Sequence, residues 1–180
     1  MTKAELDGLV LAFQAGDQRA LALLYQCYQR KLRLFAASLS GDPGIADDLV
    51  QNVWLKLSQR IHRLDDPRVF VSWLYKAVRW EVLDWQKSAG QRLQQAQCAE
   101  EAAAWIAAEP PVEYSGLHLA IRALESASQE LLQLHYFHQL ELTEIALVLG
   151  VPLGTVKSRL HRARQQLKAQ LGDEMISADD

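Results

Sequence analysis

The sequence has 180 residues, of which 49% are apolar and 23% charged, with a formal net charge of −3 at pH 7. This composition is ordinary for a folded globular protein and excludes disordered and collagen-like chains, and no apolar run is long enough to span a bilayer. The stretch from Met1 to Asp7 carries charges of both signs, so we expect no signal peptide and a cytoplasmic protein. Cys27 and Cys98 are far apart and outside any CxxC arrangement, which argues against a disulfide scaffold or a zinc knuckle.

The charges are segregated along the chain. Four acidic residues and no lysine or arginine lie between Ala96 and Ala120. Five basic residues and no acid lie between Ile145 and Leu171. A net charge near zero therefore does not exclude a nucleic-acid partner for the C-terminal part.

The first half of the chain has helical periodicity. Residues 9–39 predict one or two helices, with a break and an N-cap at Gly16-Asp17, and a turn follows at residues 41–44. The next helix has apolar residues at i, i+3, i+4, i+7, i+8 and i+11, which indicates one buried face. These residues are Ala46, Leu49, Val50, Val53, Trp54 and Leu57.

Two further segments complete the predicted layout. Asp65-Asp66-Pro67 breaks the chain before an aromatic-rich helix over residues 69–86. Residues rich in Gln, Ala and Glu, with Pro110-Pro111, then predict a linker that is helical in part. Helix resumes from Ala120 to about Leu171, before a frayed tail. We expect an all-α protein with helical domains at residues 1–92 and 118–174, joined by an acidic linker at 93–117.

Residues 142–152 have the pattern of a helix-turn-helix. Thr143 is placed to cap a short helix, Gly150 to take the turn at positive φ, and Pro152 to start the next helix. The residues expected to face inward are Ile145, Ala146 and Leu149.

The helix that follows is predicted to enter the major groove of DNA. Its core stripe is Val156, Leu160, Ala163, Leu167 and Leu171. Donors to phosphates and base edges lie beside that stripe, the combination that a recognition helix needs. The expected DNA contacts, assigned to a −35 element by the resemblance described next, are Thr155, Lys157, Ser158, Arg159, His161, Arg162 and Arg164.

Three stretches resemble extracytoplasmic-function (ECF) sigma factors, small bacterial factors that retain only the second and fourth conserved regions. Residues 150–164 resemble the final helix of that family. Residues 46–55 resemble the helix by which region 2 grips the clamp helices of the polymerase β′ subunit, and residues 70–79 the stretch that opens the −10 element.

The resemblance implies a promoter-recognition factor that binds core RNA polymerase, through its β′ and β subunits, and promoter DNA, and that commonly has a cognate anti-sigma factor. It implies no enzyme activity, no cofactor, no metal and no small-molecule substrate. The implied polymerase contacts are Asp47, Asp48, Gln51, Asn52 and Leu55. The implied −10 contacts are Arg63, Arg68, Tyr75, Lys76, Arg79 and Trp80, with a pocket for a flipped base in the loop over residues 62–68.

Some assignments stay open at the level of sequence. Trp73 is expected in the core, whereas Trp80 and Trp85 fit either the core or a stacking surface. Asn52 and Trp80 depart from the usual family residues, which affects the expected −10 preference. The linker is expected to act as a solvated tether, and the alternative is an acidic segment that threads a basic channel or covers the basic helix.

Two other functional classes fit the sequence less well. A helix-turn-helix regulator that does not bind polymerase would need another N-terminal domain, against which the motif at residues 46–55 argues. An enzyme would need a cleft with converging titratable groups. His135 and His138 are three residues apart, but the sequence offers no third metal ligand beside them, and a helix surface explains them better.

Overall fold

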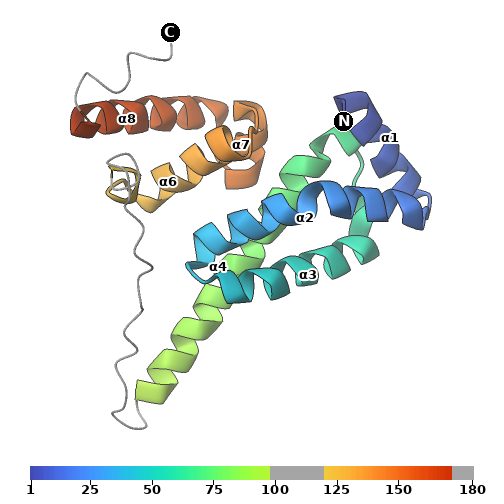
Figure 1. Ribbon diagram of the computed structural model, residues 1–180, viewed down its shortest axis with the longest axis horizontal. Helices are drawn as coiled ribbons and strands as arrows, with labels where there is room; N and C mark the ends of the chain where they lie inside the picture. The colour runs from blue at the N-terminus through green and yellow to red at the C-terminus, as the bar shows by residue number, and fades with distance from the viewer. Residues whose placement is uncertain (98–119, 172–180) are drawn as a thin grey trace. The chain divides into compact units, whose positions relative to one another are not determined.

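The computed structural model describes residues 1–97 and 120–171, and the side chains of 89–97 are not described. Within these ranges the regular structure is helical and contains no strand, as predicted. The chain divides into two compact units, one built mainly from α1 to α4 and the other mainly from α6 and α8 (Figure 1). Most of the predicted linker and the last nine residues lie outside the described ranges. No helix in those ranges is long and apolar enough to cross a membrane.

Helices α1 (Lys3–Gln14) and α2 (Gln18–Ser40) are separated at the predicted break. Gly16 has φ 95, which reverses the chain at little steric cost. The Asp17 carboxylate then caps α2 by accepting from the backbone N–H of Arg19 at 2.8 Å. At the start of α1, Thr2 and Glu5 form a reciprocal capping box.

A short turn joins α2 to α3 (Pro43–Arg60), and the two helices form a hairpin. Gly41 ends α2 in the left-handed region with φ 74, Asp42 caps α3, and Pro43 occupies its first turn. The first three residues of the predicted turn thus each have a distinct role in stopping one helix and starting the next.

Helix α4 (Phe70–Gln97) follows two short 3-10 turns, η1 (Ile61–Arg63) and η2 (Pro67–Val69). The helix continues beyond the predicted end near residue 86. Gly90 lies within it, because a single glycine costs only about 1 kcal/mol in a helix whose other residues are good helix formers.

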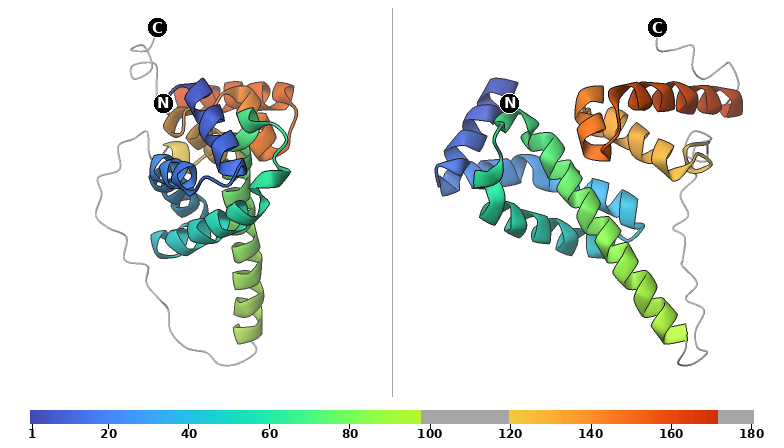
Figure 2. Two further views of the ribbon diagram at one scale, coloured as in Figure 1. Left: turned by 90° about the vertical axis from the view of Figure 1, so that its right-hand side faces the viewer. Right: turned by 180° about the vertical axis from the view of Figure 1, so that it is seen from behind.

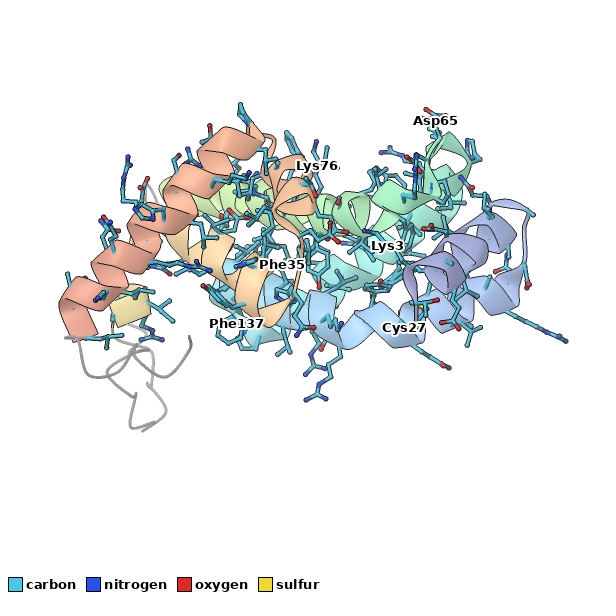
Figure 3. The ribbon with its side chains drawn as sticks, turned by 90° about the horizontal axis from the view of Figure 1, so that it is seen from above. Lys3, Cys27, Phe35, Asp65, Lys76 and Phe137 are labelled. Carbon is cyan, nitrogen blue, oxygen red and sulfur yellow. The ribbon has the colours of Figure 1, made fainter. Side chains whose placement is uncertain are left out.

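The core of the first unit confirms the predicted stripe of α3. All six residues of that stripe are at most 6% exposed. Phe35 of α2 lies edge-on to Tyr75 of α4, with ring centroids 5.3 Å apart, and Figure 3 labels Phe35. Trp54 donates its indole N–H to Oε1 of Gln29 at 2.9 Å, which joins α3 to α2.

The C-terminal part of the chain contains α6 (Ser126–Leu132), the π-helical turn η3 (Gln133–Phe137), α7 (Leu142–Leu149) and α8 (Leu153–Leu171). The predicted helix from residue 120 is interrupted at 123–125, before α6. The amide of Leu124 donates to the carbonyl of Ile121 there, and the Gln129 side chain donates to the carbonyls of Arg122 and Leu124.

The helix-turn-helix forms as expected, with two local corrections. Thr143 does not cap α7, because the helix starts one residue earlier and the Glu144 carboxylate accepts from the amide of Glu141 at 2.8 Å. Pro152 precedes α8 rather than starting it, and its carbonyl accepts the first intrahelical hydrogen bonds. Gly150 makes the turn with φ 68, as predicted.

The inward face of the helix-turn-helix is slightly rotated from the predicted one. Ile145 is fully buried, but Ala146 and Leu149 are half-buried, and Val148 at 1% exposure is the second core residue of α7. On α8 the buried residues are Val156, Leu160 and Ala163, with Leu167 and Leu171 half-buried. The predicted stripe of α8 therefore anchors the helix through its first half.

Candidate functional sites

The outer face of α3 is opposite its buried stripe. Asp48, Gln51, Asn52 and Leu55 are exposed, and Asp47 is half-buried. Leu55 is 64% exposed, although it is apolar and lies on a helix with a well-filled core. We call these five residues the α3 docking face. It combines two carboxylates with a leucine whose burial against a partner would be energetically favourable.

Helix α2 supplies one contact to the α3 docking face that the sequence did not indicate, and it has two exposed leucines. Arg33 pairs with Asp47 at 3.5 Å, and both side chains are about half exposed. Leu23 and Leu34 of α2 are also exposed, at 47% and 58%. Their spacing of eleven residues places them on one face of α2, a signal that was available in the sequence.

The loop between α3 and α4 contains two of the predicted −10 residues. Arg63 is exposed in η1. The Arg68 guanidinium forms a bidentate contact with the Asp66 carboxylate, with Nε–Oδ1 and Nη2–Oδ2 distances of 3.0 Å. This arginine holds the pKa of Asp66 below its usual value. Figure 3 labels Asp65, which is exposed in the same loop.

The structure contradicts one predicted −10 contact. Tyr75 is 1% exposed and packs against Phe35, so its ring is not available to stack on a base. Burial also raises the pKa of Tyr75 well above its usual value. The prediction was wrong because the sequence did not show which side of α4 this tyrosine is on. Tyr75 follows Leu74, and both residues belong to the inward face of the helix.

The accessible face of α4 contains the remaining predicted −10 residues. Trp80 is 58% exposed, and Lys76 and Arg79 are half-buried. Trp73, expected in the core, is half-buried, as is Trp85. Trp73, Lys76 and Trp80 are spaced i, i+3 and i+7, which places the three residues on one face of the helix. Aromatic and cationic groups in such an arrangement suit single-stranded nucleic acid.

The basic face of α8 lies beside its buried stripe. Lys157, Ser158, His161 and Arg162 are exposed, and Thr155 and Arg159 are half-buried. Lys157, Arg159 and Arg162 form no ion pair with another described residue, so their charges are available to phosphates or bases. Ser158 donates its hydroxyl to the Thr155 carbonyl, and His161 contacts Gln165 through its Nε2.

Arg164 differs from these residues because a neighbouring element holds it. Its Nε donates to the hydroxyl of Tyr136 at 2.7 Å, and its guanidinium carbon lies 5.6 Å from the centre of the same ring. Tyr136 belongs to η3, the π-helical turn in which the amide of His138 donates to the carbonyl of Gln133. Sequence reasoning had no means of linking these two positions.

The two histidines three residues apart do not form a metal site with other described residues. Nδ1 of His135 is 3.3 Å from the carbonyl oxygen of Leu140, and the ring lies edge-on to Tyr136. No group of three potential ligands occurs in the described part of the chain.

Two protein families match the chain over most of its described length. Residues 24–92 match Sigma-70 region 2, and residues 115–167 match Sigma-70, region 4. The first match contains the α3 docking face and the accessible face of α4. The second contains the helix-turn-helix.

Curated relatives give the same assignment. The chain is 30% identical over 158 residues to the ECF RNA polymerase sigma factor EcfG of Rhodopseudomonas palustris, covering 83% of this chain and 85% of that protein. The chain belongs to the ECF RNA polymerase sigma factors. It is also 29% identical over 166 residues to a probable RNA polymerase sigma factor, RfaY of Xanthomonas campestris, but spans only 42% of that protein's length.

As an ECF sigma factor, the protein binds core RNA polymerase and directs transcription initiation at specific promoters, and it is not an enzyme. A regulator that uses the same helix-turn-helix without docking on polymerase is excluded by the region 2 match. The fold is also that of RpoE of Bartonella quintana, solved in complex with the anti-sigma factor NepR. That likeness has a TM-score of 0.66 at 24% identity and covers 85% of this chain and 97% of that one.

Proposed function

We propose that the α3 docking face binds the clamp helices of the β′ subunit, as the family resemblance implies. The observation that carries this proposal is Leu55, a leucine at 64% exposure beside Asp48 and Gln51 on a helix whose opposite face is filled. A basic partner helix would neutralise the carboxylates and cover the leucine. Arg33, which pairs with Asp47, would have to exchange that contact or share it.

Two variants test the docking face. Asp48→Arg and Leu55→Glu should lower the affinity for core polymerase by roughly tenfold or more, because they place a like charge or a buried charge in the interface. Both positions are exposed, so helicity by circular dichroism should be unchanged. Asp84→Arg is the matched control, with the same charge reversal at an exposed position of α4. Wild-type affinity in both docking variants would refute the assignment.

For the −10 element, we propose the loop over residues 62–68 and the accessible face of α4. The proposed DNA contacts are Arg63, Arg68, Lys76, Arg79 and Trp80, and they do not include the buried Tyr75. Trp80 is the aromatic residue of this set and is 58% exposed, and an indole contributes about 1–3 kcal/mol when a base stacks on it. Trp80→Ala should therefore reduce promoter opening while leaving core binding intact.

For the −35 element, we propose α8 from Thr155 to Arg164. Lys157, Arg159 and Arg162 carry the proposal, because none of them forms an ion pair with another described residue and, unlike Arg164, none is held by the Tyr136 hydroxyl. Replacing all three by alanine should weaken −35 duplex binding and reduce the salt dependence by about one unit of slope per lost phosphate contact. Lys87→Ala removes one charge from an exposed position of α4 and is the control for net charge. Normal transcription by the triple variant would place the DNA face elsewhere.

We further propose two functional domains, at residues 1–92 and 118–174, and a cognate anti-sigma factor that covers surfaces of both. The solved complex of RpoE with NepR supports such a partner, and the exposed leucines of α2 and α3 provide apolar surface for one. We place the protein in the cytoplasm, where its DNA and polymerase are. Affinity purification of the tagged chain from cells, with and without stress, should recover polymerase and the anti-sigma factor as alternative partners.

A further inference from the structure

Helix α1 lies outside the part of the chain that matches Sigma-70 region 2, which begins at residue 24. It nevertheless packs against both short turns, η1 and η2, of the loop between α3 and α4 (Figure 2). That loop is the one to which the proposed function assigns −10 recognition. An element outside the family match is thus in contact with the loop expected to read the promoter.

One side chain of α1 makes two hydrogen bonds to this loop. Nε2 of Gln14 donates to the carbonyl of Ile61 at 3.1 Å and to the carbonyl of Leu64 at 2.6 Å. Both N–H groups of the amide are therefore used, and both acceptors are backbone atoms at the two ends of η1. The Ile61 carbonyl also accepts from the amide of Leu64, which closes η1, whereas the Leu64 carbonyl follows η1 and has no further helical turn to supply a donor.

A second polar residue of α1 faces the same loop. Asp7 precedes Gln14 by seven residues, so the two lie on one face of α1, with buried Val10 between them. Oδ1 of Asp7 is buried and has no hydrogen-bond partner among described atoms. The hydrogen bonds and the charge of Asp66 raise the pKa of Arg68, and the charge of Asp7 adds to this effect.

We propose that α1 is a brace for the promoter-reading loop, and that Gln14 is a positioning residue for −10 recognition. Gln14 fixes the path of the backbone from Ile61 to Leu64, which flank Arg63. The brace acts without contacting DNA. A base pocket needs a fixed backbone, because a displacement of about 1 Å is enough to weaken specific contacts.

The test compares three substitutions at Gln14 with one elsewhere. Gln14→Leu removes both donors, Gln14→Glu keeps the shape but cannot donate, and Gln14→Lys restores donors on a long side chain. Gln86→Leu is the matched control, because Nε2 of Gln86 also donates to a backbone carbonyl of the same unit, that of Leu39 at 2.9 Å, away from the loop.

The readout is base discrimination by the assembled holoenzyme. A −10 oligonucleotide is selected from a random single-stranded pool with wild-type holoenzyme, and its binding is compared with that of single-base variants. Gln14→Leu and Gln14→Glu should reduce discrimination roughly threefold to tenfold, as expected for the loss of one or two hydrogen bonds. Gln14→Lys and Gln86→Leu should stay within about twofold of wild type, and core affinity should be unchanged in all four.

Amide hydrogen exchange gives a second readout that does not depend on activity. The amides of Leu64 and Val69 donate within the loop, to Ile61 and Asp66. They should exchange faster in Gln14→Leu than in Gln86→Leu. Equal exchange and equal discrimination in these two variants would overturn the proposal, because Gln14 would then contribute stability alone.

The inference rests on the proposed −10 role of the loop, so Arg63→Ala is measured in parallel. If Arg63→Ala lowers discrimination and Gln14→Leu does not, the brace is wrong and the loop assignment stands. If neither variant changes discrimination, the loop is not the reader, and both proposals fall.

Discussion

Replacement of Tyr75 by alanine should destabilise the first unit without a direct effect on DNA. Tyr75 is 1% exposed. An aromatic side chain buries about 150–250 Å², which corresponds to roughly 4–6 kcal/mol at about 25 cal/mol per Å². Measured truncations of buried aromatic residues to alanine cost about 3–5 kcal/mol. We therefore expect a loss of about 4 kcal/mol in the free energy of unfolding, with part of it from the lost contact with Phe35.

The assay is urea denaturation of the full chain, followed by tryptophan fluorescence. Four of the five tryptophans lie between residues 54 and 85, so the signal reports mainly on the first unit. Tyr75→Phe keeps the ring and should cost no more than about 1.5 kcal/mol. The reasoning would be refuted if Tyr75→Ala left the unfolding midpoint unchanged but weakened binding to a −10 oligonucleotide, since that result requires an accessible ring.

Five further substitutions have defined expected outcomes. Asp66→Asn keeps the oxygen that caps η2 but removes the charge that pairs with Arg68. Single-stranded DNA should therefore bind about two- to fivefold more tightly at low salt and equally at high salt, as measured by fluorescence anisotropy. In the wild type the Asp66 carboxylate is ionised at neutral pH, and because Arg68 lowers its pKa, acidification should mimic the substitution only below the usual range for an aspartate. Tyr136→Phe should weaken −35 duplex binding up to threefold with an unchanged salt slope, whereas Arg164→Ala should reduce the slope by about one. Gly150→Ala should cost about 1 kcal/mol through its positive φ alone, because a Cβ there meets nothing within 4 Å. Gly154→Ala, in α8 and equally uncrowded, should instead stabilise by up to about 1 kcal/mol, as measured by thermal circular dichroism.

The helices and their ends were largely predictable from the sequence, because local chemistry decides them. The stripe from Ala46 to Leu57 has the period of a helix, and Gly41 and Asp42 each suit the backbone conformation that they adopt. Thr143 and the neighbouring Glu144 both have side chains that can accept from a backbone amide at the start of α7, and Glu144 is the one that does so. The three-residue spacing of Glu141 and Glu144 is the local feature of the sequence that indicates this cap.

The contacts between distant segments were not predictable in the same way. Whether Tyr75 faces the core or the solvent depends on the angle at which α4 crosses its neighbours, and an aromatic residue suits both environments. Gln14 is one of many glutamines in the sequence, and nothing local marks its two acceptors near residue 60. The contact of Arg164 with Tyr136 depends on the wide π-helical turn, which adds a residue to the register.

The brace formed by α1 also affects the order in which the protein is made. Gln14 and its two acceptors are 47 and 50 residues apart, and all of them precede α4 in the chain. Both sides of this contact leave the ribosome long before α8 has been synthesised. Because N-terminal domains generally fold first during synthesis, the promoter-reading loop can reach its final shape on the nascent chain. An N-terminal tag or truncation that displaces α1 would therefore disturb the loop from its first appearance.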